Sequence, residues 1–219
     1  MTEIFVHKGI EVETEVPVGS LAEELGTTRD AFLKRAAIFG GSAVAAASVG
    51  MVLPQSAFAT KKSDLAILNF ALTLEYLESS FYAIAVGKGR FSPRVEQLAK
   101  VIRDHEIAHV KALVPTIKSL GGTPVKKPRF NFPPSIFADE TTFLQTAMAL
   151  EDTGVGAYNG AGPALTLRPV KEAAASIVAV EAMHASWVRG VAGTAPAPAS
   201  FDELLTDDEV LAAAGPFFA

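Results

Sequence analysis

Two Glu-x-x-His pairs constrain this chain more than any other feature. Glu106 precedes His109, and Glu181 precedes His184, in segments whose apolar residues recur every three or four positions. Side chains three positions apart lie on the same face of a helix, so each pair presents a carboxylate oxygen and an imidazole nitrogen to one point. Because the apolar residues share that face, both pairs are expected to point into a protein core.

Chance does not explain the pairing well. Only three histidines follow Ala59, together with ten glutamates. A random arrangement would place a glutamate three positions before two of these histidines only about once in a hundred sequences. A single pair would more often be a surface pair or a satisfied core pair, whereas two pairs indicate a shared site.

The part of the chain after Ala59 contains four long helical patterns and a short fifth one. Proline or a capping residue marks the starts, and glycine marks several of the ends. Pro115 is expected to kink the second helix, and the fifth helix is expected to pack across the end of the others. The patterns run from Ser63, the predicted N-cap, to Val86; from Pro93 to Leu120; from the cap region at Asp139 to Asn159-Gly160; from Pro169 to Gly190; and after the capping box at Thr206 to Glu209.

The connections between the helices predict the topology. The first two patterns are joined by the tight turn GKGRFS, but roughly 17 residues rich in Pro and Phe separate the second from the third. A link of that length can cross the length of a bundle and leave the second and third helices parallel. The sequence therefore predicts an all-α, ferritin-like four-helix bundle with a long crossover between helices 2 and 3, plus a short C-terminal helix.

One carboxylate also interrupts the apolar stripe of each remaining long helix, at Glu75 and at Glu151. A buried charge costs several kcal/mol unless it is paired or bound to a cation. Two divalent metal ions would neutralise the four carboxylates, and the alternative is a hydrogen-bonded, partly protonated cluster. The predicted metal ligands are Glu75, Glu106, His109, Glu151, Glu181 and His184.

Three segments carry a resemblance to known proteins. LNFALTLE, ending at Glu75, resembles the first-helix motif of bacterioferritins and other ferritin-like proteins, and HEIAHVKAL and VEAMHASWVR resemble their two Glu-x-x-His helices. With the signal-like leader and the PRFNFPPSIF segment, the chain resembles bacterial ferritin-like domain proteins grouped with plant desiccation-related proteins. The resemblance implies two iron ions, with Glu75 and Glu151 as terminal or bridging ligands, and manganese stays an alternative because its ligand preferences are similar.

Haem is not predicted, because no methionine is evident as a haem ligand. Met148 and Met183 are instead assigned to core packing.

Several neighbours of the predicted ligands have two interpretations. Tyr82 and Tyr158 are expected to hydrogen-bond a carboxylate or to donate an electron, with core packing as the alternative for at least one of them. Glu78 is either an alternative ligand or a surface charge, and His105 is assigned to the helix surface or to contact with a ligand. Gly154, in the third helix, suggests a close approach or room beside the site.

Residues 1–59 are interpreted as a leader and residues 60–219 as the ferritin-like domain. Lys34 and Arg35 precede an uncharged run that ends in an A-x-A cleavage pattern at Ala59, the order of an export signal. TRDAFLK resembles the twin-arginine motif, with Asp30 in place of the second arginine. The prediction is export to the periplasm or cell envelope; the alternative is a membrane anchor at residues 36–53.

Composition narrows the function classes. The chain has no cysteine, which excludes disulfides and thiolate chemistry, and its formal charge of −5 argues against nucleic-acid binding. The predicted function is an exported dimetal protein that oxidises Fe(II) with oxygen or peroxide. The alternatives are a protective bundle for desiccation stress without turnover, and manganese-dependent peroxide disproportionation. The sequence leaves the oligomeric state open.

Overall fold

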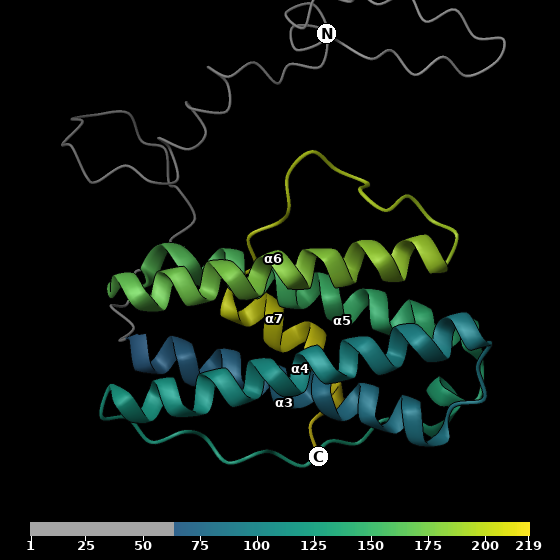
Figure 1. The fold of residues 1–219 in the computed structure, drawn as a ribbon, viewed down its shortest axis with the longest axis horizontal. Coiled ribbons are helices and arrows are strands. Elements are labelled where there is room, and N and C mark those ends of the chain that lie inside the picture. The colour runs from purple at the N-terminus through teal and green to yellow at the C-terminus, as the bar shows by residue number, and fades with distance from the viewer. Residues whose placement is uncertain (1–63) are drawn as a thin grey trace, which may run out of the picture. The chain divides into compact units, whose positions relative to one another are not determined.

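The computed structural model describes residues 64–219, which form a helical bundle. Four long helices lie side by side and a shorter helix packs against them (Figure 1). None of these described helices is long and apolar enough to cross a membrane. The predicted leader, the alternative anchor and the cap Ser63 lie outside the described residues. The long helices are α3 (Asp64–Lys88), α4 (Pro93–Ser119), α5 (Glu140–Ala161) and α6 (Arg168–Val191), and the shorter one is α7 (Asp207–Ala214).

Local signals set the helix ends, and the predicted ends lie within two residues of the observed ones. The Asp139 carboxylate accepts a hydrogen bond of 2.7 Å from the backbone N–H of Thr142 and caps α5. Thr206 and Glu209 form the predicted capping box at the start of α7. Helix α4 continues through Pro115, so the proline does not end it.

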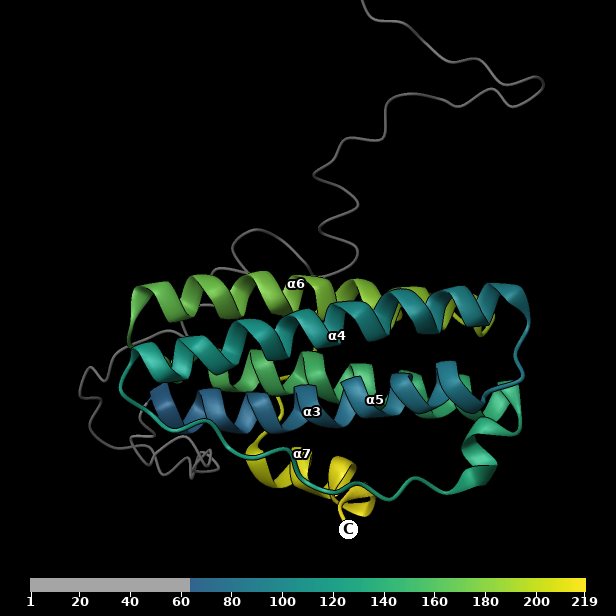
Figure 2. The same cartoon turned by 60° about the horizontal axis from the view of Figure 1, so that its bottom comes forward.

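The chain order gives two antiparallel pairs, α3 with α4 and α5 with α6. Residues 120–139, which we call the strap, connect the two pairs and run along the outside of the bundle for its length, so that α4 and α5 point the same way (Figure 2). The strap is held in place, because the Val125 N–H donates to Asn69 Oδ1 at 2.7 Å and Phe132 packs on Phe81. This arrangement confirms the predicted bundle with its long crossover.

Two apolar clusters fill the interior on either side of a central acidic layer. The aromatic end is dominated by phenylalanine rings, and Phe81 stacks on Phe143 with their centroids 5.3 Å apart. The aliphatic end contains no buried phenylalanine and is built from leucine, isoleucine and valine. The aromatic end includes Phe81, Phe91, Phe132, Phe137 and Phe143, and the aliphatic end includes Ile67, Leu68, Leu72, Leu113, Ile117 and Ile177.

Helix α7 lies along the flank of α5, so the prediction that it packs across the end of the bundle was wrong (Figure 2). The reason is that two glycines on α5, Gly156 and Gly160, carry no side chain where Leu205 approaches. The Leu205 N–H donates to the Gly156 carbonyl at 3.0 Å, and a Cβ at Gly156 would lie only 2.5 Å from the Leu205 side chain. A Cβ at Gly160 would lie 2.0 Å from the Leu205 carbonyl oxygen. Both glycines therefore let the segment before α7 approach the middle of α5.

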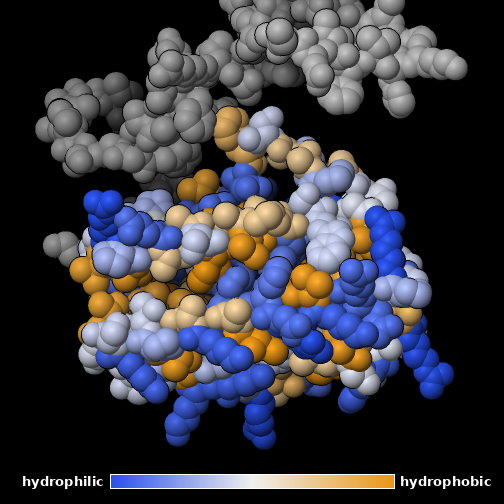
Figure 3. Space-filling view, viewed as in Figure 1, coloured by the Kyte–Doolittle hydropathy of each residue, from blue (hydrophilic) through white to orange (hydrophobic). Residues whose placement is uncertain are grey.

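The two methionines assigned to the core differ. Met148 is half-buried against the aromatic end, as predicted, whereas Met183 is 60% exposed on α6, so its assignment to the core was wrong. Figure 3, which views the side of the bundle with α4 and α6, shows hydrophobic side chains interspersed with hydrophilic ones. Met183 lies two positions after Glu181, which turns it about 200° away from the interior stripe.

Candidate metal centre

The six predicted ligands come together in the central acidic layer. Each long helix contributes one glutamate, and α4 and α6 each add the histidine of a Glu-x-x-His pair. All four carboxylates are completely buried, and the two imidazoles are nearly so. The spacing of three therefore placed both members of each pair on the interior face, as expected.

The geometry separates the ligands into two overlapping groups. Glu75 and His109 belong to the first group only, and Glu151 and His184 to the second only, while Glu106 and Glu181 belong to both. Within each group one ligand atom per residue lies within 4.8 Å of all the others. Two such groups of four match two metal positions that share two carboxylates.

The shared carboxylates each face both histidines. Glu106 Oε2 lies 3.3 Å from His109 Nδ1, and Glu106 Oε1 lies 3.1 Å from His184 Nδ1. Glu181 Oε1 lies 3.0 Å from His109 Nδ1, and its Oε2 lies 3.9 Å from His184 Nδ1. Each shared carboxylate therefore directs one oxygen to each position, as a bridging ligand requires.

Several of these buried atoms have no hydrogen-bond partner in the protein. They are Glu106 Oε1, Glu151 Oε2, both carboxylate oxygens of Glu181, and His184 Nδ1. The nearby groups have the distance but not the angle of a hydrogen bond. Buried polar atoms normally find a partner, and carboxylate oxygens and imidazole nitrogens are common ligands of iron, manganese and zinc. The donor set therefore fits divalent metal ions.

The electrostatics describe the metal-free form. Burial alone would raise the pKa of Glu106, but the adjacent imidazoles of His109 and His184 lower it to about 2. Burial opposes charge on the imidazoles as well, yet the surrounding carboxylates raise the pKa of both histidines to about 12. Burial and repulsion from Glu181 raise the pKa of Glu151 to about 8, although His184 opposes the shift. Without metal, protons balance the charge, and metal binding would displace them.

Two tyrosines orient the carboxylates that belong to only one group. The Tyr82 hydroxyl donates to Glu151 Oε1 at 2.5 Å, and the Tyr158 hydroxyl donates to Glu75 Oε1 at 2.5 Å. Each tyrosine follows the glutamate of its own helix by seven positions but bonds the glutamate of the other helix. The expectation that these tyrosines bond carboxylates is confirmed. In both carboxylates Oε2 is left to face the histidine and the metal position.

His105 contacts the site from outside. Its side chain is exposed, its Nδ1 lies 2.9 Å from His184 Nε2, and the two rings stack. This contact occupies the His184 nitrogen that faces away from the carboxylates and directs Nδ1 toward them. His105 was predicted to lie on the helix surface or to contact a ligand, and it does both.

Glu78 is a fifth buried carboxylate beside the six ligands. Burial, followed by repulsion from Glu181 and Glu106, raises its pKa well above the ordinary value. A Cβ at Gly154 would lie 3.0 Å from Glu78 Oε1 and 3.4 Å from Glu181 Oε2. Gly154 thus leaves room beside the site, as the sequence suggested, and Glu78 is not the surface charge that was its alternative interpretation.

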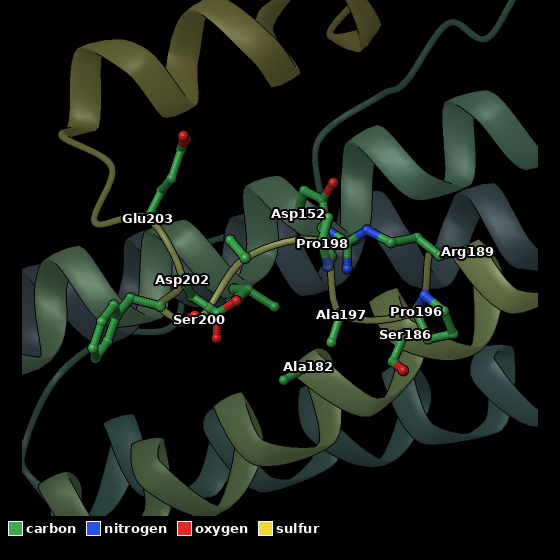
Figure 4. Close-up of a pocket in the computed structure, with 13 residues that line it drawn as sticks. Asp152, Ala182, Ser186, Arg189, Pro196, Ala197, Pro198, Ser200, Asp202 and Glu203 are labelled. Carbon is green, nitrogen blue, oxygen red and sulfur yellow. The ribbon is translucent and has the colours of Figure 1, made fainter. Parts of the chain in front are cut away.

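A cavity of about 620 Å³ lies between α5, α6 and residues 196–203 (Figure 4). Its wall includes Asp152 and Ala182, which follow the ligands Glu151 and Glu181 in sequence, but none of the six ligands. Arg189 forms an ion pair with Asp152 there. This cavity is therefore separate from the metal positions.

Comparisons with known proteins agree with this geometry. A family described as Ferritin-like domain matches residues 63–194. Among solved structures, a conserved hypothetical protein from Mycobacterium tuberculosis is similar, with a TM-score of 0.55 and 18% sequence identity over 66% of this chain and 99% of that one. At that identity the likeness concerns the fold. The comparison with curated proteins gave no match.

Proposed function

This chain belongs to the ferritin-like domain family, and from that premise we propose that it binds two iron ions and oxidises Fe(II) with an oxygen-derived oxidant. The ligands would be Glu75, Glu106, His109 and Glu181 at one position and Glu106, Glu151, Glu181 and His184 at the other. Two Fe(II) ions would supply two electrons, which with two protons reduce dioxygen to hydrogen peroxide or peroxide to two water molecules.

The arrangement of Glu106 and Glu181 carries the proposal. Each has one oxygen toward His109 and the other toward His184, and three of these four oxygens lack a hydrogen-bond partner in the protein. A proton-bonded cluster would be expected to satisfy these oxygens with donors. Two cations between the shared carboxylates account for them better.

The residues around the six ligands hold the ligand side chains in position and shield them from water. The tyrosine hydroxyls hold one oxygen of Glu75 and one of Glu151, and so fix the orientation of the other oxygen. His105 holds His184 in the same way. The complete burial of the four carboxylates keeps bulk water from competing for the ligand atoms.

An anaerobic Fe(II) titration of the protein, followed by addition of oxidant, tests the proposal. We expect saturation at two Fe(II) per chain and conversion to Fe(III) that is fast compared with free Fe(II). Glu106→Ala should abolish tight binding at both positions, because Glu106 belongs to both groups. Glu96→Ala, a change of an exposed glutamate on the same helix, is the matched control. Binding of fewer than two ions, or equal behaviour of the two variants, would contradict the proposal.

Other outcomes of the titration identify other functions. Two tightly bound ions without oxidation would mean that the metal stabilises the bundle, as in a stress-protective protein. Manganese in the protein isolated from its own host, with release of oxygen from peroxide, would instead indicate peroxide disproportionation. Both outcomes would reject iron oxidation.

We also propose that the protein acts outside the cytoplasm, on the pattern of residues 34–59. Cell fractionation with N-terminal sequencing of the mature protein tests this. A mature chain in the envelope fraction that begins at Thr60 is the expected result. A full-length chain in the cytoplasm would reject export.

A further inference from the structure

A second cavity lies inside the aliphatic end of the bundle. Its volume is about 40 Å³, and all four long helices contribute to its wall. Leu68 of α3, Leu113 of α4, Ala157 of α5 and Ile177 of α6 represent the four sides. The cavity therefore lies among the bundle helices themselves, unlike the cavity that α5 and α6 form with residues 196–203.

The wall of this cavity offers almost nothing to a polar ligand. Hydroxyl groups occur on Thr116 and Tyr158, and each already donates its proton elsewhere, to the Ala112 carbonyl at 2.7 Å and to Glu75 at 2.5 Å. A water or peroxide molecule there would lose most of its hydrogen bonds. Apolar cavities of this kind stay dry and take up apolar guests such as xenon.

The size of the cavity limits the guest further. A volume of about 40 Å³ is a few times the roughly 10–15 Å³ needed for one water-sized molecule. A diatomic gas or a single xenon atom fits this space. An organic substrate of ordinary size does not, since ligand pockets for such molecules measure roughly 300–1,000 Å³.

The wall of the cavity contains both exposed residues and a residue that contacts a ligand. Ala112 on α4 and Ala173 on α6 are exposed and small. Tyr158 is half-buried, and its hydroxyl is hydrogen-bonded to the ligand Glu75. A guest beside Tyr158 is thus one side chain away from the first ligand group.

We propose that this cavity is a binding site for dioxygen on its way to the metal centre, so that the oxidant is dioxygen and not peroxide. The assignment of the oxidant rests on the proposed iron oxidation, whereas the binding of a small apolar gas does not. An uncharged apolar molecule enters such a space without losing hydrogen bonds. Peroxide would lose its hydrogen bonds to water there.

Xenon-pressurised crystals of the metal-free protein test the binding site. We expect one xenon atom among Leu68, Tyr158 and Ile177 in the wild type and loss of that atom in Ala174→Leu, because Ala174 is half-buried and borders the cavity. Ala175→Leu changes the exposed neighbouring residue and should retain xenon. A wild-type cavity without xenon would overturn the proposal, whether or not the protein oxidises iron.

Oxidation rates test the route with the same variants. Ala174→Leu should slow Fe(II) oxidation by dioxygen severalfold and leave oxidation by peroxide unchanged, while Ala175→Leu should change neither rate. Equal slowing with both oxidants, or an unchanged rate with dioxygen, would overturn the route. Xenon bound in a protein that oxidises no Fe(II) would reject the proposed function but leave the gas site in place.

Discussion

The two ends of the bundle interior solve the same packing problem in different ways. At the aromatic end, Phe143 stacks on both Phe81 and Phe91, and the strap and α7 cover the cluster from outside. At the aliphatic end, leucine, isoleucine and alanine side chains leave a cavity of about 40 Å³ between the helices. One end is therefore filled by stacked rings, whereas the other keeps an apolar cavity beside Tyr158, the residue that bonds Glu75.

The two tyrosines show the same difference at the level of single residues. Tyr82 is completely buried and lies against Phe81 with ring centroids 5.1 Å apart. Tyr158 is half-buried and borders the cavity. Both donate to one carboxylate of the centre, so the chemistry is matched and only the surroundings differ.

Truncating the aromatic end should have the largest effect. Phe81→Ala removes a completely buried ring that touches four other aromatic rings. We expect a loss of about 3–5 kcal/mol in the free energy of unfolding, measured by denaturant titration of the metal-free protein. Phe201→Ala, at a 44% exposed ring, is the control and should cost far less. A loss below about 1 kcal/mol for Phe81→Ala would show that this end is loosely packed.

The same substitution, alanine to leucine, should change the free energy of unfolding in opposite directions at the two ends. Ala147 is completely buried at the aromatic end, and Ala147→Leu should destabilise the protein by about 1–3 kcal/mol through overpacking. Ala174→Leu fills the cavity and should stabilise the protein by about 0.5–2 kcal/mol. Denaturant titration measures both. Destabilisation of equal size at both positions would remove the distinction between the ends.

Removing the two tyrosine hydroxyls compares the ends at the metal centre. Tyr82→Phe and Tyr158→Phe each free one oxygen of a buried carboxylate and should cost about 1–2 kcal/mol of stability in the metal-free protein. Each should also weaken metal binding at one position, with Tyr82→Phe acting through Glu151 and Tyr158→Phe through Glu75. Calorimetric metal titration separates the two positions. Unchanged binding in both variants would show that the hydroxyls do not orient the ligands.

The stability of the acidic layer should depend on pH, whereas that of the apolar ends should not. The pKa of Glu151 is raised from 4.5 to about 8, so its contribution to stability is complete below pH 4.5 and is lost as the pH rises through 8. The pKa of His109 and His184 is raised from 6.5 to about 12, which acts in the same direction above pH 6.5. In chelator, the Tm should therefore fall between pH 5 and pH 8.

The control for the pH experiment is Glu151→Gln, which should make the fall in Tm between pH 5 and pH 8 shallower, because one of the groups that loses its proton is removed. Saturating metal should reverse the slope, because metal ligands bind in their deprotonated form. A metal-free Tm that rises over this interval would contradict the charge distribution described for the acidic layer.

Most of the metal centre could be predicted from the sequence, because it depends on local periodicity. Glu75, Glu106, Glu151 and Glu181 interrupt apolar stripes, and the helix phase alone brings them inside. The long connection before α5 likewise predicted the crossover. These features need only the geometry of one helix or the length of one loop.

Features that depend on contacts between elements could not be predicted. Glu78 stayed ambiguous because α3 is buried on most of its faces, so the apolar pattern does not distinguish an inner side. The flank position of α7 depends on Leu205 meeting Gly156 and Gly160, which no pattern within either segment indicates. The contact of His105 with His184 depends in the same way on how α4 lies against α6.

The most direct test of the dimetal centre is anomalous diffraction at the iron edge from crystals grown anaerobically with Fe(II). The arrangement of Glu106 and Glu181 predicts two iron peaks per chain, one beside Glu75 and His109 and the other beside Glu151 and His184. Both shared carboxylates should bridge the peaks. A single peak, or an iron-free cluster of protonated carboxylates under saturating Fe(II), would contradict the account.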